Sequence, residues 1–112
     1  MRVYVAGPYS SGDVDENVRT AIRCADAVLE SGHTPFIPHL THFWDQQKPH
    51  AYETWLQYDS EWLAVCDALI RIPGESPGAD REMAQARNLG IHVFQGIDEW
   101  LSAVCAVERV TE

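Results

Sequence analysis

The sequence is poor in basic residues: 8 Lys and Arg stand against 17 Asp and Glu, for a formal net charge of −9. Polynucleotides and anionic membranes bind basic surfaces, so this balance argues against both partners.

Cysteine is also scarce. Cys24, Cys66 and Cys105 are odd in number, far apart and set in apolar patterns. We therefore expect reduced core thiols of a cytoplasmic protein, rather than a disulfide frame or a zinc site.

Long hydrophobic runs are missing as well. No stretch approaches the roughly 20 apolar residues of a transmembrane helix, and no secretory signal pattern precedes the first predicted strand. The chain does contain 46% hydrophobic residues and 4 tryptophans in 112 residues. This content argues against disorder and is enough for one modest core. We expect residues 1–112 to form a single domain without linkers or repeats.

Strand-like and helix-like patterns alternate along the chain. This alternation predicts an α/β fold: a three-layer open parallel sheet of four to five strands with helices on both faces, Rossmann-like or flavodoxin-like. Pro35 and Pro38 bracket the second strand, and proline cannot donate to a central ladder, so this strand is placed at a sheet edge. The predicted strands are 3–6, 36–37, 68–72 and 91–94. The predicted helices are 14–31, about 51–65, about 77–89 and 97 to about 107.

The stretch 66–84 organises the predicted site. A short apolar strand ends at the turn Pro73-Gly74, and Ser76-Pro77 has the pattern of an N-cap followed by proline at the first helical position. Strand, glycine-containing loop and helix N-terminus in this order can hold an anion or polar ligand, because free N–H groups point into the loop. Open parallel sheets bind ligands beyond the carboxyl ends of their strands. Here those ends are residues 7–11, 38–42 and 73–78.

Asp59 and Glu82 are the candidate catalytic residues. Asp59 interrupts an apolar stripe, four residues after Trp55 and four before Leu63, so it must be hydrogen-bonded, paired or lining a cleft. Glu82 lies roughly two turns into the helix after the central strand. Two carboxylates beside an anomeric carbon can cleave its bond, one as nucleophile or charge stabiliser and the other acting on the leaving group. The residues alone also allow a purely structural role for each. Glu82 could be an ordinary acidic residue near a helix start, and Asp59 could hydrogen-bond to a neighbouring loop.

The segment 39–50 is predicted to be an irregular loop over the site. His39, His42, Asp45 and His50 could form a metal site, since the segment contains a His-x-x-His pair. The flanking prolines and the lack of a helical pattern favour solvated loop histidines, so a metal hydrolase is the weakest alternative. The aromatic residues expected to pack, or to offer a stacking face to a planar base, are Tyr9, Trp44, Trp55 and Trp62.

Three motifs together resemble the nucleoside 2-deoxyribosyltransferase superfamily. They are VYVAGPYS at 3–10, D-x-x-W-L-x-x-C-D-A at 59–68, and P-G-x-S-x-G-A-x-x-E-x-x-x-A-x-x-x-G at 73–90. The chain is most similar to a short branch with an opening Gly-Pro-Tyr, whose neighbour is the branch of 2′-deoxynucleoside 5′-monophosphate N-glycosidases. The resemblance covers nearly the whole chain and is weakest over 9–51.

The resemblance implies roles for individual residues. Glu82 matches the family's nucleophile, Asp59 the aspartate that assists the departing base, and Tyr4 the strand tyrosine that positions the glutamate. Ser76 and the backbone of Gly78 match the loop that holds the sugar 5′ group or its phosphate.

The first loop supplies further expected substrate contacts, from Gly7, Tyr9 and Ser10. The monophosphate glycosidases carry an arginine where this chain has Ser10. Phosphate recognition therefore lacks its usual charge here, although Ser10, Ser11 and backbone N–H groups could substitute.

The resemblance implies an enzyme that cleaves or transfers the N-glycosidic bond of a nucleoside or a nucleoside 5′-monophosphate, without a metal or organic cofactor. It further implies a homodimer, because family sites often borrow residues from a neighbouring subunit. The alternative is a non-catalytic nucleotide-binding or sensor domain of the same fold. The choice of base, ribose or deoxyribose, and hydrolysis or transfer stay open.

Overall fold

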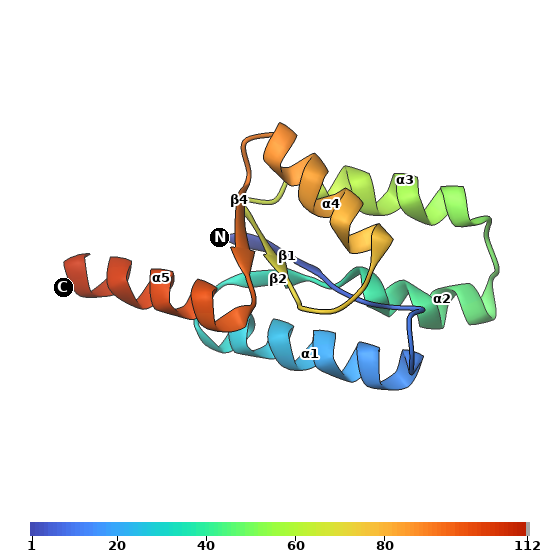
Figure 1. Cartoon of the computed structure of the whole chain (residues 1–112), viewed down its shortest axis with the longest axis horizontal. Helices are drawn as coiled ribbons and strands as arrows, with labels where there is room; N and C mark the ends of the chain where they lie inside the picture. The colour runs from blue at the N-terminus through green and yellow to red at the C-terminus, as the bar shows by residue number, and fades with distance from the viewer. Residues whose placement is uncertain (112) are drawn as a thin grey trace.

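The computed structural model describes residues 1–111, and the side chains of residues 1–105. Four strands form one sheet in the order β2-β1-β3-β4, and every neighbouring pair is parallel (Figure 1). The strands are β1 (Arg2–Ala6), β2 (Thr34–Phe36), β3 (Ala68–Arg71) and β4 (His92–Gln95). The helices are α1 (Val14–Glu30), the 3-10 turn η1 (Pro38–Leu40), α2 (Thr41–Gln47), α3 (Tyr52–Leu63), α4 (Pro77–Asn88) and α5 (Ile97–Thr111).

Helices cover both faces of the sheet. Figure 1 shows α3 and α4 on one side, with α1 and α5 on the other. This arrangement confirms the predicted three-layer α/β class, with four strands in a flavodoxin-like order. The core under α1 and α5 includes Val3, Val5, Val28, Ile70 and Trp100, and the core under α3 and α4 includes Tyr4, Leu63, Leu69, Ala79 and Ala86.

The alternation of side chains along β1 sets the geometry of the site. Val3 and Val5 belong to the core on the α1 side, whereas Tyr4 and Ala6 belong to the core on the α3–α4 side. Complete burial of a valine contributes about 1.5–3 kcal/mol, so a one-residue slip that exchanged the two faces would be costly. The pattern therefore fixes Tyr4 on the face that carries α4.

The edge position predicted for β2 is confirmed. Pro35 lies within this strand, opposite Val3 of β1, and β2 has no neighbour on its other side among the described residues. The predicted cap of α4 is confirmed too. The Ser76 hydroxyl oxygen accepts the N–H of Ala79 at 3.1 Å, and Pro77 begins the helix.

Two expectations from the sequence are wrong. The segment predicted as an irregular loop forms η1 and the seven-residue helix α2. Where the two meet, the Thr41 hydroxyl donates to the carbonyl of Pro38 at 2.8 Å. Cys105 is exposed on α5, whereas Cys24 and Cys66 are buried as expected.

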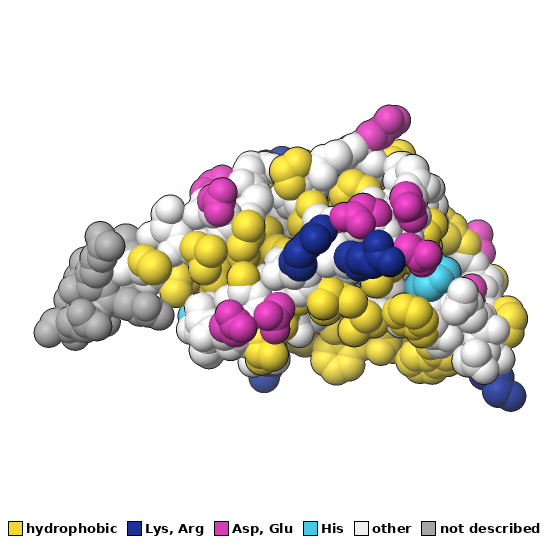
Figure 2. Space-filling view, turned by 90° about the horizontal axis from the view of Figure 1, so that it is seen from below, with side chains coloured by type: hydrophobic (Ala, Val, Ile, Leu, Met, Phe, Trp, Pro, Cys, Tyr) yellow, Lys and Arg dark blue, Asp and Glu magenta, His cyan; other side chains and the backbone are white. Residues whose placement is uncertain are grey.

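The surface agrees with the acidic composition. Figure 2 shows the molecule from the side of α1, where acidic and hydrophobic side chains are widespread and basic ones are few. The basic side chains of α1, Arg19 and Arg23, both pair with Glu16. Within residues 1–111, no helix combines the length and the hydrophobicity needed to cross a membrane.

Candidate active site

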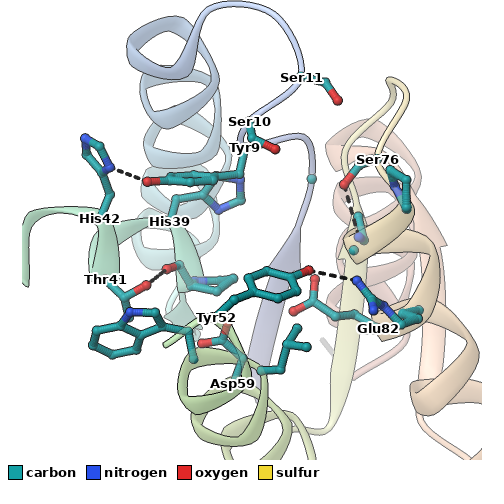
Figure 3. A pocket seen from close by; sticks show the side chains of 18 of the residues that line it. Tyr9, Ser10, Ser11, His39, Thr41, His42, Tyr52, Asp59, Ser76 and Glu82 are labelled. Carbon is teal, nitrogen blue, oxygen red and sulfur yellow. Dashed lines mark hydrogen bonds between the residues drawn. The ribbon is translucent and has the colours of Figure 1, made fainter. Parts of the chain in front are cut away.

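A cavity of about 450 Å³ lies beyond the carboxyl ends of β1, β2 and β3. This is the edge at which an open parallel sheet is expected to bind its ligand. Its walls come from the first loop, η1, α2, α3 and the start of α4 (Figure 3). The predicted site residues that line it are Gly7, Tyr9, Ser10, Asp59, Ser76, Gly78 and Glu82.

Tyr4, the remaining predicted site residue, lies beneath the cavity and is completely buried. Its hydroxyl donates a hydrogen bond to Oε2 of Glu82, which joins β1 to α4. Burial, followed by the charges of Glu82 and Asp59, raises the pKa of Tyr4, so the phenol stays protonated and keeps donating. Tyr4 can therefore orient Glu82 without touching a ligand.

Glu82 and Asp59 reach the same cavity from α4 and α3 (Figure 3). Burial raises the pKa of Glu82 to about 7, opposed first by the hydrogen bond from Tyr4 and then by the positive charges of Arg81 and Arg71. Burial, followed by the negative charge of Glu82, raises the pKa of Asp59 to about 7. At neutral pH the pair can thus hold one proton between its members.

The surroundings decide which carboxyl group keeps that proton. The Tyr4 hydroxyl stabilises the anion of Glu82. The buried Oδ1 of Asp59 has no hydrogen-bond partner among the described residues, so nothing comparable stabilises its anion. We infer that Glu82 ionises first and that Asp59 retains the proton. Asp59 also lines the cavity. Of the three surroundings expected for a carboxylate in an apolar stripe, it therefore has the third, a place in the wall of a cleft.

Two cross-links between α3 and α4 hold the carboxylates in place. Nη2 of Arg81 donates to the hydroxyl of Tyr52 at 2.9 Å. Nε2 of Gln85 donates to the hydroxyl oxygen of Ser60 at 2.9 Å. In sequence, Asp59 lies between Tyr52 and Ser60 on α3, and Glu82 lies between the other two partners on α4.

Close packing joins the first loop to the loop after β3. A Cβ added to Gly7 would lie 2.8 Å from Cβ of Ile72. Gly74 has a φ of +126°, and a Cβ there would lie 2.7 Å from Cγ of Pro8. Only glycine allows these approaches. Gly7 thus has a structural reason for its identity besides its place in the cavity wall.

Ser76 and Gly78 line the cavity where α4 begins. The Ser76 oxygen accepts the N–H of Ala79, which leaves its O–H free to donate. Gly78 has no positive φ, and a Cβ at this position would meet only the Nη2 atom of Arg81, at 4.0 Å. The packing of the protein therefore does not require a glycine at position 78.

The opposite wall is built from aromatic and histidine side chains. The hydroxyl of Tyr9 hydrogen-bonds to Nδ1 of His42. Nε2 of buried His39 lies 3.0 Å from the carbonyl oxygen of Pro8, and since a carbonyl only accepts, Nε2 carries the proton. Burial lowers the pKa of His39, so it is neutral, and its Nδ1 has no partner among the described residues.

Asp45 has a structural role in the same wall. Its Oδ1 accepts the indole N–H of Trp55 at 2.7 Å and the backbone N–H of His50 at 2.9 Å, which ties α2 to α3. These bonds lower the pKa of Asp45. No three His, Cys, Asp or Glu residues in the described part of the chain are grouped so that they could hold a metal ion. The proposed ligand set of His39, His42 and Asp45 therefore does not form.

The sequence did not predict the contribution of Arg81 and Tyr52 to the cavity. Arg81 follows Gly78 by three residues on α4, which places the two on one face of the helix. This spacing could have indicated Arg81. No comparable spacing indicates Tyr52, because its link to Arg81 joins segments that are 29 residues apart.

The fold and the cavity define an open α/β domain with two carboxylates at the carboxyl edge of its sheet. Residues 1–95 match the family described as a domain of unknown function, DUF7768, and the chain belongs to this family. No curated protein matches the sequence.

Solved structures share the fold. A 2-deoxyribosyltransferase from Bacillus psychrosaccharolyticus is 20% identical with a TM-score of 0.63, over 83% of this chain and 69% of the enzyme. A conserved protein from Enterococcus faecalis V583 is 17% identical with a TM-score of 0.65, over 83% of this chain and 60% of that protein. The predicted likeness to the 2-deoxyribosyltransferase fold is confirmed at the level of the fold.

Proposed function

We propose that this protein cleaves or transfers the N-glycosidic bond of a nucleoside or a nucleoside 5′-monophosphate. The observation that carries this proposal is the meeting of Asp59 and Glu82 in one cavity, with the hydroxyl of Tyr4 on Glu82. The cavity volume of about 450 Å³ falls within the roughly 300–1,000 Å³ of small-ligand pockets. The fold shared with a 2-deoxyribosyltransferase supports the same substrate class.

In the proposed first step, the ionised carboxylate of Glu82 attacks the anomeric carbon. A bond forms between a carboxylate oxygen and that carbon while the bond to the base nitrogen breaks. Asp59 gives its proton to the departing base, and the Tyr4 hydroxyl holds the glutamate in line. The products are a free base and a glycosyl ester on Glu82.

In the second step, the ester is released. For hydrolysis, a water molecule gives a proton to the carboxylate of Asp59, and its oxygen attacks the anomeric carbon, which regenerates Glu82. For transfer, the N–H of a second base replaces water. Gly7, Tyr9, Ser10, Ser76 and Gly78 line the cavity and are proposed to hold the sugar and its 5′ group.

Release of free base from ribo- and deoxyribonucleosides and their 5′-monophosphates tests the proposal. We expect release by the wild-type protein and a loss of at least about 1,000-fold in Glu82→Gln, because the nucleophile is gone. Glu30→Gln makes the same change at an exposed position of α1 and should keep full activity. Release that survives in Glu82→Gln would refute this mechanism, and tight binding without release would indicate a nucleotide-binding or sensor domain.

We also propose that the protein is a homodimer. Exposed aromatic side chains on α2 and α3, among them Phe43, Trp44 and Trp62, offer a surface for a second copy.

A further inference from the structure

Two arginines flank the loop between β3 and α4, and their surroundings differ. Arg71 is buried, and its guanidinium donates to the carbonyls of Ile72 and Gly74 and to Asp80. Its donors hold the loop. Arg81 is exposed, and the described residues provide one hydrogen-bond partner for its side chain, the hydroxyl of Tyr52.

Arg81 lies at the cavity. It is the one Lys or Arg among the described residues that line this space, which also contains the acidic groups of Asp45, Asp59 and Glu82. None of these carboxylates comes within ion-pair distance of Arg81, since the ion pairs in the described part of the chain involve other residues. Most of its five N–H donors thus remain open to a ligand.

The guanidinium lies over the loop expected to hold the sugar 5′ end. Its Nη2 is 4.0 Å from the position that a Cβ on Gly78 would take, and Ser76 and Gly78 also line the cavity. The hydroxyl of Tyr52 holds that nitrogen from α3 at 2.9 Å (Figure 3). Because Tyr52 restrains a long side chain, Arg81 loses less conformational entropy when it binds a ligand.

Charge decides which ligand gains from this arrangement. A phosphate that approached the ionised Glu82 without a cation nearby would be repelled, in a protein whose net charge is already −9. A guanidinium can bind phosphate through two parallel N–H donors, and such charge-assisted bonds are stronger than neutral ones. An uncharged 5′-hydroxyl would gain far less.

We propose that Arg81 binds the 5′-phosphate of the substrate, so that the proposed enzyme acts on nucleoside 5′-monophosphates in preference to nucleosides. This inference rests on the proposed function. It also accounts for Ser10, because a cation from α4 replaces the one missing from the first loop. The hydroxyls of Ser10 and Ser11, which line the cavity, then serve as neutral donors.

The decisive quantity is the ratio of kcat/KM for a 2′-deoxynucleoside 5′-monophosphate to kcat/KM for the matching 2′-deoxynucleoside. We expect a ratio well above one in the wild type and a fall of roughly 10- to 100-fold in Arg81→Gln. Loss of Arg81 also affects the protonation of Glu82, but that effect is common to both substrates and cancels in the ratio. Arg81→Lys should fall between the two, since lysine keeps the charge and loses the planar fork.

Two further variants are informative. Arg87→Gln removes the same charge from an exposed position in the last turn of α4, outside the cavity lining, and should leave the ratio unchanged. Tyr52→Phe frees the guanidinium and should lower the ratio by less than Arg81→Gln does. A ratio near one in the wild type, or an equal effect of Arg81→Gln and Arg87→Gln, overturns the inference.

Binding separates this inference from the proposed function. Calorimetry with the same pairs of compounds should show tighter binding of the monophosphate, and the difference should shrink in Arg81→Gln. If binding shows this preference and no base is released, the enzymatic proposal fails and the role of Arg81 stands. If base is released without a preference for the monophosphate, the enzymatic proposal stands and the role of Arg81 fails. If neither compound binds, the role of Arg81 fails as well.

Discussion

The proposed role of Glu82 as nucleophile depends on one neighbouring hydroxyl, that of Tyr4. Removing it in Tyr4→Phe destabilises the carboxylate anion and raises the pKa of Glu82 further. Because the proposed nucleophile must be ionised, the acid limb of the kcat/KM profile should move to higher pH. A hydrogen bond to a charged group contributes about 1.5–3 kcal/mol, which corresponds to roughly one to two pH units. The measurement is base release against pH, and an acid limb that stays in place would show that Tyr4 does not act through this bond.

The same pair of carboxyl groups ties stability to pH. The pKa values of Glu82 and Asp59 are raised to about 7, so the folded protein holds protons that the unfolded chain releases at lower pH. The contribution of these two groups to the free energy of unfolding should therefore be largest below about pH 4. It should fall as the pH rises to about 7. Above that pH, Glu82→Gln should be more stable than the wild type by on the order of 2 kcal/mol, because glutamine cannot ionise.

Urea unfolding at pH 5 and pH 8 measures this difference. The matched variant Glu30→Gln should follow the wild-type dependence on pH, since position 30 is exposed. If the free energies of unfolding of the wild type and Glu82→Gln fall in parallel between pH 5 and pH 8, ionisation of buried Glu82 does not destabilise the folded protein. A gain in stability at the expense of activity would be typical of a functional carboxylate.

At the scale of elements, two glycines that line the cavity, Gly7 in the first loop and Gly78 in the first turn of α4, should respond differently to alanine. Gly78→Ala meets only Arg81 Nη2 at 4.0 Å, in the first turn of α4, so the free energy of unfolding should hold or rise by up to about 1 kcal/mol. Activity should fall about 10-fold or more, because a methyl group enters the space where a ligand approaches the backbone. Gly7→Ala places its Cβ 2.8 Å from Cβ of Ile72 and should cost about 1–3 kcal/mol of stability.

Denaturant unfolding and base release of both variants test this contrast. Equal losses of stability would contradict the close contact at Gly7 and the open space at Gly78. Full activity in a folded Gly78→Ala would remove the backbone at position 78 from the proposed binding surface.

The regular elements could be predicted because each has a local signal. Short apolar runs that end at glycine–proline turns placed β1 and β3, helical spacing placed α1, and Ser76-Pro77 marked the start of α4. Helix α2 has no such signal, because seven residues between prolines offer too few turns for a periodic pattern. The exposure of Cys105 could not be predicted from the apolar pattern around it, because the pattern does not show which side of α5 packs on the sheet.

The candidate site could be predicted in part. Asp59 was indicated by its conflict with an apolar stripe, and Glu82 by its distance from the loop after β3. The link between Tyr52 and Arg81 could not be found this way, because it depends on how α3 and α4 lie against each other. Contacts between helices depend on packing across the sheet, which no local pattern contains.

At the scale of the whole molecule, an exposed aromatic surface coexists with a net charge of −9. Trp62 of α3 is 46% exposed and stacks on Phe36 of β2 at 5.5 Å between ring centroids. Trp44 of α2 is 49% exposed and packs edge-on against Trp55 and Tyr58. Apolar association through this surface must overcome the repulsion between two acidic protomers.

Salt should therefore promote the proposed dimer. The Debye length falls from about 30 Å at 0.01 M to about 8 Å at 0.15 M ionic strength, which screens the repulsion and leaves the aromatic contact intact. Sedimentation velocity should show a dimer fraction that rises between these two conditions, and Trp62→Lys should abolish it. Leu29→Lys introduces the same charge at another exposed apolar residue, on α1, and should still form the dimer. A monomer in both salt conditions would mean that this aromatic surface is not an interface between copies. Equal behaviour of the two lysine variants would mean the same, because a contact centred on α3 should be sensitive to Trp62→Lys and not to Leu29→Lys.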